Sequence, residues 1–251
     1  MLTSQRRRLI LDKLANEGQI VAKTLSQSLG LSEDTIRRDL RELAQEGLLQ
    51  RVHGGALPAS PAVVNFAGRQ NLATDEKVAL GQAGARMIRP GQVVILDGGT
   101  TALQVARHLP AQLRATVVTH SPTIAVELVE HPLVEVVLLG GHLFKHSVVA
   151  VGAATIEAIS RIRADFYFMG VTGIHPVVGL STGDLEEAHV KRALSASAAE
   201  TILLASAEKL NAASPFVIAP VTEASEIVVV RRVPEEATAE FERLGITITR
   251  V

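Results

Sequence analysis

The sequence predicts an α/β chain in two parts, a small N-terminal domain of three helices and a hairpin followed by a larger domain on a mostly parallel sheet. In residues 1–57, apolar residues repeat at helical spacing, and a weakly alternating segment then runs into Gly54-Gly55. From residue 75 onward, short Val/Ile/Leu runs alternate with helical patterns, which indicates a sheet covered by helices on both faces. We therefore expect domains at 1–57 and 72–251, joined by a linker at 58–71 that contains Pro58, Ser60 and Pro61.

The first two predicted helices are short and amphipathic. Leu9, Ile10 and Leu14 give one apolar face to a helix over Thr3–Glu17, and a second helix is expected over Ala22–Leu29. The arginines that begin at Arg6 lie near the positive end of the first helix dipole, a cost that nearby phosphates would offset.

A third helix is expected to begin after Ser32, which can cap it, and to end before Gly47. Its apolar face holds Ile36, Leu40 and Leu43. The opposite face carries arginines, and arginine reads guanine or grips phosphate in the DNA major groove. An ordinary amphipathic helix with a solvated basic face is the alternative.

The order of the elements favours DNA binding. Gly30-Leu31 makes a tight turn between the second and third helices, which is the helix-turn-helix order. Leu48–His53 followed by Gly54-Gly55 predicts a hairpin with its tip at the two glycines, a wing whose polar side chains lie near the DNA. The residues expected to contact DNA are Arg6, Ser32, Thr35, Arg37, Arg38, Arg41, Arg51 and His53.

Composition restricts the function further. The chain has no cysteine, which excludes disulfides, Cys-based zinc sites and thiol catalysis. We expect a cytoplasmic protein, because no run of about 18 apolar residues and no signal peptide is present. Residues 1–57 hold nine Lys and Arg against seven Asp and Glu, a net charge of +2, and the remainder carries −3. So small a positive charge per subunit predicts that a homo-oligomer, a dimer or tetramer, binds double-stranded DNA.

The larger domain alternates between helices and strands. Helices are expected over Glu76–Ile88, Thr101–His108, Pro122–Glu130, Ala153–Ile162, Leu185–Ala199 and Pro234–Leu244. Strands are expected over Gln92–Asp97, Ala115–Thr119, Val134–Leu139, Asp165–Val171, Thr201–Ala205, Phe216–Ala219, Glu226–Val230 and Ile246–Val251.

A ligand site is expected where these strands end, since ligands bind beyond the carboxyl ends of parallel strands. Asp97-Gly98-Gly99-Thr100-Thr101 lies between a strand and a helix, and its backbone N–H groups and hydroxyls suit a phosphate. A plain tight turn is the alternative. Other strand ends would meet on the same rim. The residues expected to bind a small effector are Asp97, Gly98, Gly99, Thr100, Thr101, Thr119, His120, Gly140, Gly141, Gly170, Gly173, Thr182, Glu187, Lys191 and Lys209.

Two pairs of residues spaced four apart in this part of the chain could be taken for functional sites but have simpler interpretations. Glu187 and Lys191 are spaced i, i+4 on a predicted helix, so by spacing alone a surface salt bridge is the better interpretation. His142 and His146 are also four apart, but the segment reads as loop and strand, so no metal site is expected.

Ser32–Leu40 and Arg51–Ala56 together resemble the amino-terminal signature of DeoR-type transcriptional regulators. The resemblance extends over essentially the whole chain, including Phe66 and Arg69 at an aromatic-x-x-Arg element and Asp97–Thr101 at an Asp-Ser-Gly-Thr-Thr phosphate loop. It implies a winged helix-turn-helix domain and a sensor domain similar to the ribose-5-phosphate isomerase and coenzyme A transferase fold. It also implies that the sensor binds a phosphorylated sugar or polyol. For Phe66 we favour docking of the linker over a ligand role.

Four positions depart from the pattern of that family. Gly98 stands in place of a serine, His120 in place of an asparagine, and Ser206 and Glu208 in place of the aspartate and serine before the family's lysine, here Lys209. We still expect a phosphorylated sugar or polyol as the effector. A sugar acid, a shifted ligand pose and a silenced sensor are the alternatives.

Two functions follow from these observations. The first is a repressor of a carbohydrate-catabolism operon whose operator affinity changes when the effector binds, with no enzymatic activity and no cofactor. The alternative is a phosphosugar isomerase with an appended DNA-binding domain, in which Asp97, Glu187 and Lys191 supply the acid and base groups.

Overall fold

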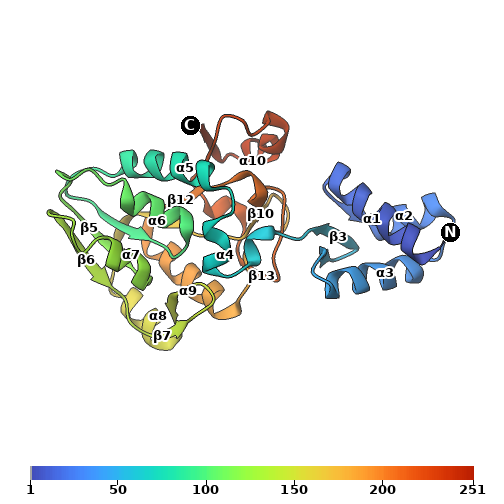
Figure 1. Cartoon of the computed structure of the whole chain (residues 1–251), viewed down its shortest axis with the longest axis horizontal. Helices are drawn as coiled ribbons and strands as arrows, with labels where there is room; N and C mark the ends of the chain where they lie inside the picture. The colour runs from blue at the N-terminus through green and yellow to red at the C-terminus, as the bar shows by residue number, and fades with distance from the viewer. Residues whose placement is uncertain (1) are drawn as a thin grey trace.

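The computed structural model describes residues 2–251 and has a small N-terminal domain at one end of a larger α/β domain (Figure 1). The predicted helices form as α1 (Thr3–Glu17), α2 (Ala22–Leu29) and α3 (Glu33–Gln45). Ile10, Leu14, Ile36, Leu40 and Leu43 are all buried in one apolar core. Burial of these side chains holds the three helices together.

The wing is a three-stranded sheet in place of the expected two-stranded hairpin. Strands β1 (Ile20–Val21), β3 (Gly55–Pro58) and β2 (Leu49–Val52) pair antiparallel in that order. The predicted glycine pair has two separate roles. Gly54 makes the turn with a φ of +78°, while Gly55 is already in β3, where a Cβ would lie 1.7 Å from the carbonyl oxygen of Ile20. The two-residue strand β1 is too short to give a sequence signal.

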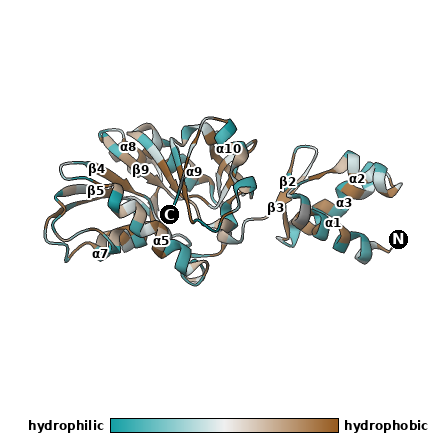
Figure 2. Cartoon of the chain, turned by 90° about the horizontal axis from the view of Figure 1, so that it is seen from above, coloured by the Kyte–Doolittle hydropathy of each residue, from teal (hydrophilic) through white to brown (hydrophobic). Residues whose placement is uncertain are grey.

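The larger domain is built on a seven-stranded sheet in which every neighbouring pair is parallel. In spatial order the strands are β15 (Thr247–Arg250), β14 (Glu226–Val229), β12 (Ala198–Leu204), β9 (Ala164–Met169), β4 (Val93–Leu96), β5 (Ala115–Thr119) and β6 (Val134–Leu138). The strands at the middle of the sheet, such as β4 and β9, consist mainly of buried hydrophobic residues, and both are labelled within the larger domain in Figure 2.

Helices cover both faces of the sheet. Helix α6 (Thr100–Arg107) packs between α5 (Thr74–Met87) and α7 (Pro122–Glu127), while α8 (Ala153–Ile159) packs on α9 (Leu185–Ala196). Strands β4 and β9 are adjacent although four other strands and three helices separate them in sequence, so the strand order reverses between them. A crevice at such a reversal is where ligands bind in open α/β sheets.

Several elements outside this sheet differ from the sequence predictions. Strands β7 (His142–Phe144) and β8 (Val149–Val151) form a hairpin, and β10 (Gly173–His175), β11 (Gly179–Thr182) and β13 (Phe216–Ala219) form an antiparallel sheet. The helix expected over Pro234–Leu244 is divided at Thr238 into η4 (Glu235–Ala237) and α10 (Ala239–Arg243).

The segment between the domains also contains regular structure, η1 (Pro61–Val63) and α4 (Phe66–Gln70). The larger domain has two further short 3-10 helices, η2 (Ala207–Lys209) and η3 (Val221–Glu223). Within residues 2–251, no helix has the length and apolar character needed to cross a membrane.

Candidate ligand-binding cavity and DNA-binding surface

The exposed face of α3 and the wing present the basic side chains predicted to contact DNA. Ser32 caps the helix by accepting a hydrogen bond from the Thr35 backbone N–H (3.2 Å). Arg38, Arg41, Arg51 and His53 are exposed, and none of the ion pairs within residues 2–251 includes them. Arg37 is also exposed but pairs with Glu33 at 2.7 Å.

Arg6 does not belong to this surface, so the prediction that it contacts DNA is wrong. Its side chain is buried and forms a two-pronged ion pair with Asp39, which is also buried. The pair joins α1 to α3 across 33 residues of sequence. Arg6 therefore positions the helix that carries the DNA-facing residues.

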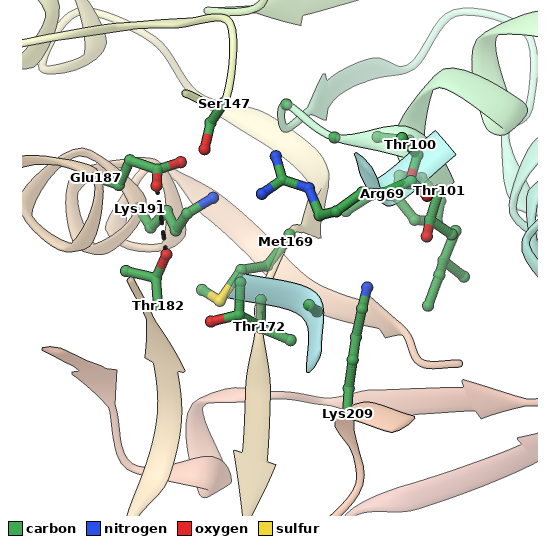
Figure 3. Close-up of a pocket in the computed structure, with 18 of the residues that line it drawn as sticks. Arg69, Thr100, Thr101, Ser147, Met169, Thr172, Thr182, Glu187, Lys191 and Lys209 are labelled. Atoms are coloured by element: carbon green, nitrogen blue, oxygen red, sulfur yellow. Dashed lines mark hydrogen bonds between the residues drawn. The ribbon is translucent and has the colours of Figure 1, made fainter. Parts of the chain in front are cut away.

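A cavity of about 60 Å³ lies at the ends of β4 and β9 (Figure 3). Nine residues of the predicted effector site line it: Gly98, Gly99, Thr100, Thr101, Gly170, Thr182, Glu187, Lys191 and Lys209. They come from the loop after β4 and the start of α6, from the residue after β9, from β11, from α9 and from η2. The fold thus brings together segments more than 100 residues apart.

The start of α6 places hydrogen-bond donors at this cavity. Gly99 has a φ of +115°, a conformation that L side chains rarely adopt, and the helix begins at Thr100. The first N–H groups of a helix have no partner within the helix, and the helix dipole adds positive potential there. The Thr101 hydroxyl is buried and has no hydrogen-bond partner among the described residues. These donors are available to an anionic ligand.

Besides Lys191, three cationic side chains line the same space. Arg69 extends across the cavity, and Lys209 reaches toward Thr101 (Figure 3). Lys77 is buried, and its Nζ donates to the Arg69 carbonyl oxygen (2.7 Å). Burial, together with the nearby charges of Lys77 and Arg69, lowers the pKa of Lys209 to about 8. Such crowding of positive charge is relieved when an anion binds.

The opposite wall of the cavity carries a carboxylate. Glu187 and Thr182 lie together, with the Thr182 hydroxyl donating to Glu187 over 3.5 Å (Figure 3). Glu187 and Lys191 are both buried, so the interpretation of this i, i+4 pair as a surface salt bridge is wrong. Lys191 pairs instead with Asp97 (2.8 Å). The Glu187 carboxylate can accept hydrogen bonds from ligand hydroxyls.

Asp97 is fully buried behind the cavity wall, where it ties the surrounding elements together. Its carboxylate accepts hydrogen bonds from Lys191 Nζ (2.8 Å), His120 Nε2 (2.8 Å), the Tyr167 hydroxyl (2.5 Å) and two backbone N–H groups. Burial opposes ionisation, but the charge of Lys191 and the hydrogen bond from His120 hold the pKa of Asp97 well below its ordinary value. Burial and the Asp97 charge raise the pKa of Tyr167 well above its usual range. Asp97 therefore positions the loop.

Six residues predicted to bind the effector do not line the cavity: Asp97, Thr119, His120, Gly140, Gly141 and Gly173. His120 is fully buried and joins Asp97 to the carbonyl oxygen of Ala150 (2.8 Å). Gly140 and Gly141 follow β6 at the sheet edge, two strands away from β4. Gly173 is packed so closely that a Cβ would lie 2.6 Å from the Ala212 carbonyl oxygen.

The departures from the family pattern also have structural counterparts. A Cβ at Gly98 would lie 2.1 Å from a methyl group of Val149, so the small residue matches the bulk of β8. Ser206 donates to the Glu208 carboxylate (2.7 Å), and Glu208 forms no ion pair with Lys209 in the described chain. Lys209 thus keeps its charge available to the cavity.

Four polar or charged residues of the cavity were not predicted as ligand-binding: Arg69, Lys77, Ser147 and Thr172. The aromatic-x-x-Arg element was the one available signal, and it pointed to Arg69. His142 and His146 lie on either side of Phe144, whose ring stacks on that of His146 at 5.7 Å. In residues 2–251, no group of three or more His, Asp or Glu side chains is arranged to hold a metal ion.

Comparison with known proteins identifies both parts of the chain. Residues 6–61 match the DeoR-like helix-turn-helix domain, and residues 72–230 match the DeoR C terminal sensor domain. The HTH-type transcriptional regulator GlpR of Haloferax volcanii is 32% identical, with 99% of this chain and 98% of the relative covered. The glycerol-3-phosphate regulon repressor of Escherichia coli K12 is 31% identical over 84% of each chain.

Among solved structures, ribose 5-phosphate isomerase A from Methanocaldococcus jannaschii overlaps with 51% of each chain at 15% identity and a TM-score of 0.38. The two relatives from Haloferax volcanii and Escherichia coli are named as transcriptional regulators, which are not enzymes.

Proposed function

The chain belongs to the DeoR family of transcriptional regulators, and on that premise we propose that it is a repressor of a carbohydrate-catabolism operon controlled by a phosphorylated sugar or polyol. The observation that carries the proposal is the donor-rich cavity at the start of α6, with the buried Lys209 and the Thr101 hydroxyl, which has no partner among residues 2–251. A phosphate is the group that such a set of donors recognises.

The shape of the site supports a ligand with two chemically different ends. A cavity of about 60 Å³ is small, which suits a compact anionic group better than a whole sugar. Arg69, Ser147, Thr172 and Glu187 also line a second cavity of about 300 Å³. The hydroxyl-bearing end of the ligand would extend along this shared wall, where Glu187 accepts hydrogen bonds.

The isomerase alternative has less support. A general base must reach the proton it abstracts, but Asp97 is fully buried and its carboxylate already accepts five hydrogen bonds. The named relatives are regulators, among them a repressor of a glycerol-3-phosphate regulon.

For DNA binding we propose a homodimer or homotetramer in which at least two copies of α3 and the wing engage one operator. Exposed Arg38, Arg41 and Arg51 supply few phosphate contacts per subunit, and a second subunit doubles them.

A thermal-shift screen of the full chain tests the proposed ligand class. Phosphorylated sugars and polyols are compared with their dephosphorylated forms, and a ligand at 100 times its Kd should stabilise the fold by about 2.7 kcal/mol. Lys209→Met should lose the response, while Lys145→Met, which changes an exposed lysine outside the cavity, should keep it. Equal shifts with both forms of every pair, or no shift at all, would contradict the proposal.

A further inference from the structure

One cation of the cavity does not come from the sensor domain. Arg69 lies in α4, within the segment that joins the DNA-binding domain to the sensor, and its side chain extends into the cavity (Figure 3). The matches to the two domain families end at residue 61 and begin again at residue 72, so Arg69 falls between them.

The guanidinium of Arg69 is held in place but not neutralised. Its Nη1 donates to the Val64 carbonyl oxygen (2.9 Å), which fixes the side chain against its own segment. No ion pair within residues 2–251 includes Arg69, whereas Lys191 is paired with Asp97. A planar guanidinium with free N–H groups in a cavity is suited to two-pronged binding of a phosphate.

The same segment, residues 58–71, is hydrogen-bonded through both backbone and side chains to residues that line the cavity or adjoin it. The Ser60 hydroxyl donates to the Thr172 carbonyl oxygen, and the Phe66 N–H donates to the His146 carbonyl oxygen (2.8 Å), next to Ser147. The Arg69 carbonyl oxygen accepts from Lys77 Nζ (2.7 Å) and from the Thr100 hydroxyl (3.5 Å). Any shift of the cavity wall therefore reaches this segment directly.

Arg69 also faces the N-terminal domain. The second cavity, of about 300 Å³, is lined by Arg69 together with Ala44, Leu49 and Gln50 of that domain. Arg69 is thus placed between the ligand cavity and the end of α3 and start of the wing.

From this placement we propose that Arg69 is an anion-binding residue supplied by the linker, so that the ligand is clamped between α4 and the start of α6. The inference rests on the proposed function, and it adds how the cavity is coupled to DNA binding. The bound anion holds the linker against the sensor domain. Because the linker is joined to the DNA-binding domain, ligand binding then changes how that domain is held. Such coupling requires different ligand affinities for the docked and undocked linker.

The test uses the full chain with inorganic phosphate as the probe. Phosphate affinity is measured by calorimetry, and hydrogen exchange is followed at the backbone amides of residues 58–71. Arg69→Ala should weaken phosphate binding by about tenfold or more, the loss typical of a charge-assisted hydrogen bond, and should abolish phosphate-induced protection of the linker. Arg69→Lys keeps the positive charge but loses the two-pronged guanidinium, so its phosphate affinity and linker protection should lie between those of the wild type and Arg69→Ala. Gln70→Ala, an exposed neighbour in α4 outside the cavity, is the matched control and should behave as the wild type.

The possible outcomes separate this inference from the proposed function. Phosphate binding with protection confined to residues 98–102, unchanged in Arg69→Ala, would overturn the role of Arg69 and leave the proposed function standing. Failure of the wild-type chain to bind phosphate or any phosphorylated sugar would overturn both. Loss of linker protection in Arg69→Ala and partial loss in Arg69→Lys, with correspondingly weakened phosphate binding and unchanged melting temperatures, would support the clamp.

Discussion

Replacing Thr101 by valine should change stability and ligand binding in opposite directions. The two side chains have nearly the same shape, so the change removes a hydroxyl and leaves the packing in place. In the free protein, that hydroxyl is buried without a partner among the described residues. A polar group in this position costs free energy in the free protein and is satisfied when a phosphate oxygen binds.

The magnitudes follow from this difference between the free and bound states. A buried unsatisfied hydroxyl costs about 1–3 kcal/mol, so Thr101→Val should raise the free energy of unfolding by about 1 kcal/mol. For a chain of this length, that is a rise in Tm of about 2–4 °C. A hydrogen bond to a charged oxygen contributes about 1.5–3 kcal/mol, so phosphate affinity should fall by about 10- to 150-fold.

The assay is thermal unfolding of both proteins without ligand, paired with calorimetric titration of phosphate. Thr100→Val is the matched control, because the Thr100 hydroxyl already donates to the Arg69 carbonyl oxygen (3.5 Å) and should give no gain in stability. A Thr101→Val protein that is less stable than the wild type and binds phosphate equally well would refute the assignment of this hydroxyl to the ligand.

Other predictions concern Lys209, the Arg6–Asp39 pair and Arg38. Burial lowers the pKa of Lys209 to about 8, and an anion binds its protonated form, so sulfate affinity should be full below pH 8 and fall as the pH rises through 8, measured by calorimetry. Arg6→Ala leaves the Asp39 carboxylate buried without its partner and should destabilise the N-terminal domain by about 3–5 kcal/mol, measured by urea unfolding. Arg38→Ala should weaken DNA binding and reduce the slope of log K against log salt by about 1, measured by fluorescence anisotropy.

Each of these predictions has a control. Lys209→Arg keeps its charge across the range and should flatten the pH profile, and a flat profile in the wild type would contradict the role of Lys209. Replacement of both Arg6 and Asp39 by apolar residues should recover much of the stability lost in Arg6→Ala, and no loss in the single variant would contradict a structural role. Arg243→Ala, in the sensor domain, is the control for Arg38→Ala and should leave DNA affinity unchanged. Unchanged DNA affinity in Arg38→Ala would contradict the assigned DNA-binding surface.

Much of this architecture could be predicted from the sequence because its signals are local. Helix α3 has a cap at Ser32, an apolar face at helical spacing and a stop at Gly47, whose φ is +74°. The strands of the parallel sheet are continuous apolar runs, and the rule that ligands bind at strand ends placed the Gly98–Thr101 loop on the cavity. The missed strands β1 and β10 are two and three residues long, too short for a pattern of alternation, and β1 forms only by pairing with the distant strand β3.

The rest of the site depends on contacts that no local pattern records. A strand end says which rim a residue occupies but not which way its side chain points, so Asp97 and His120 were placed in the cavity and lie behind its wall. Arg6 was read as a free cation because its partner, Asp39, is 33 residues away. Arg69 and Lys77 reach the cavity from segments on the amino-terminal side of the first strand of the sheet.

The measurement that tests the central claim most directly is the affinity of the full chain for its operator with and without a phosphorylated ligand from the thermal-shift screen. An operator fragment selected from genomic DNA by the protein itself serves as the probe, with anisotropy as the readout. A coupling free energy of about 1–3 kcal/mol predicts a change in affinity of about 5- to 150-fold with the phosphorylated ligand and none with its dephosphorylated form. Operator affinity that stays the same while the cavity is saturated would contradict regulation through this site.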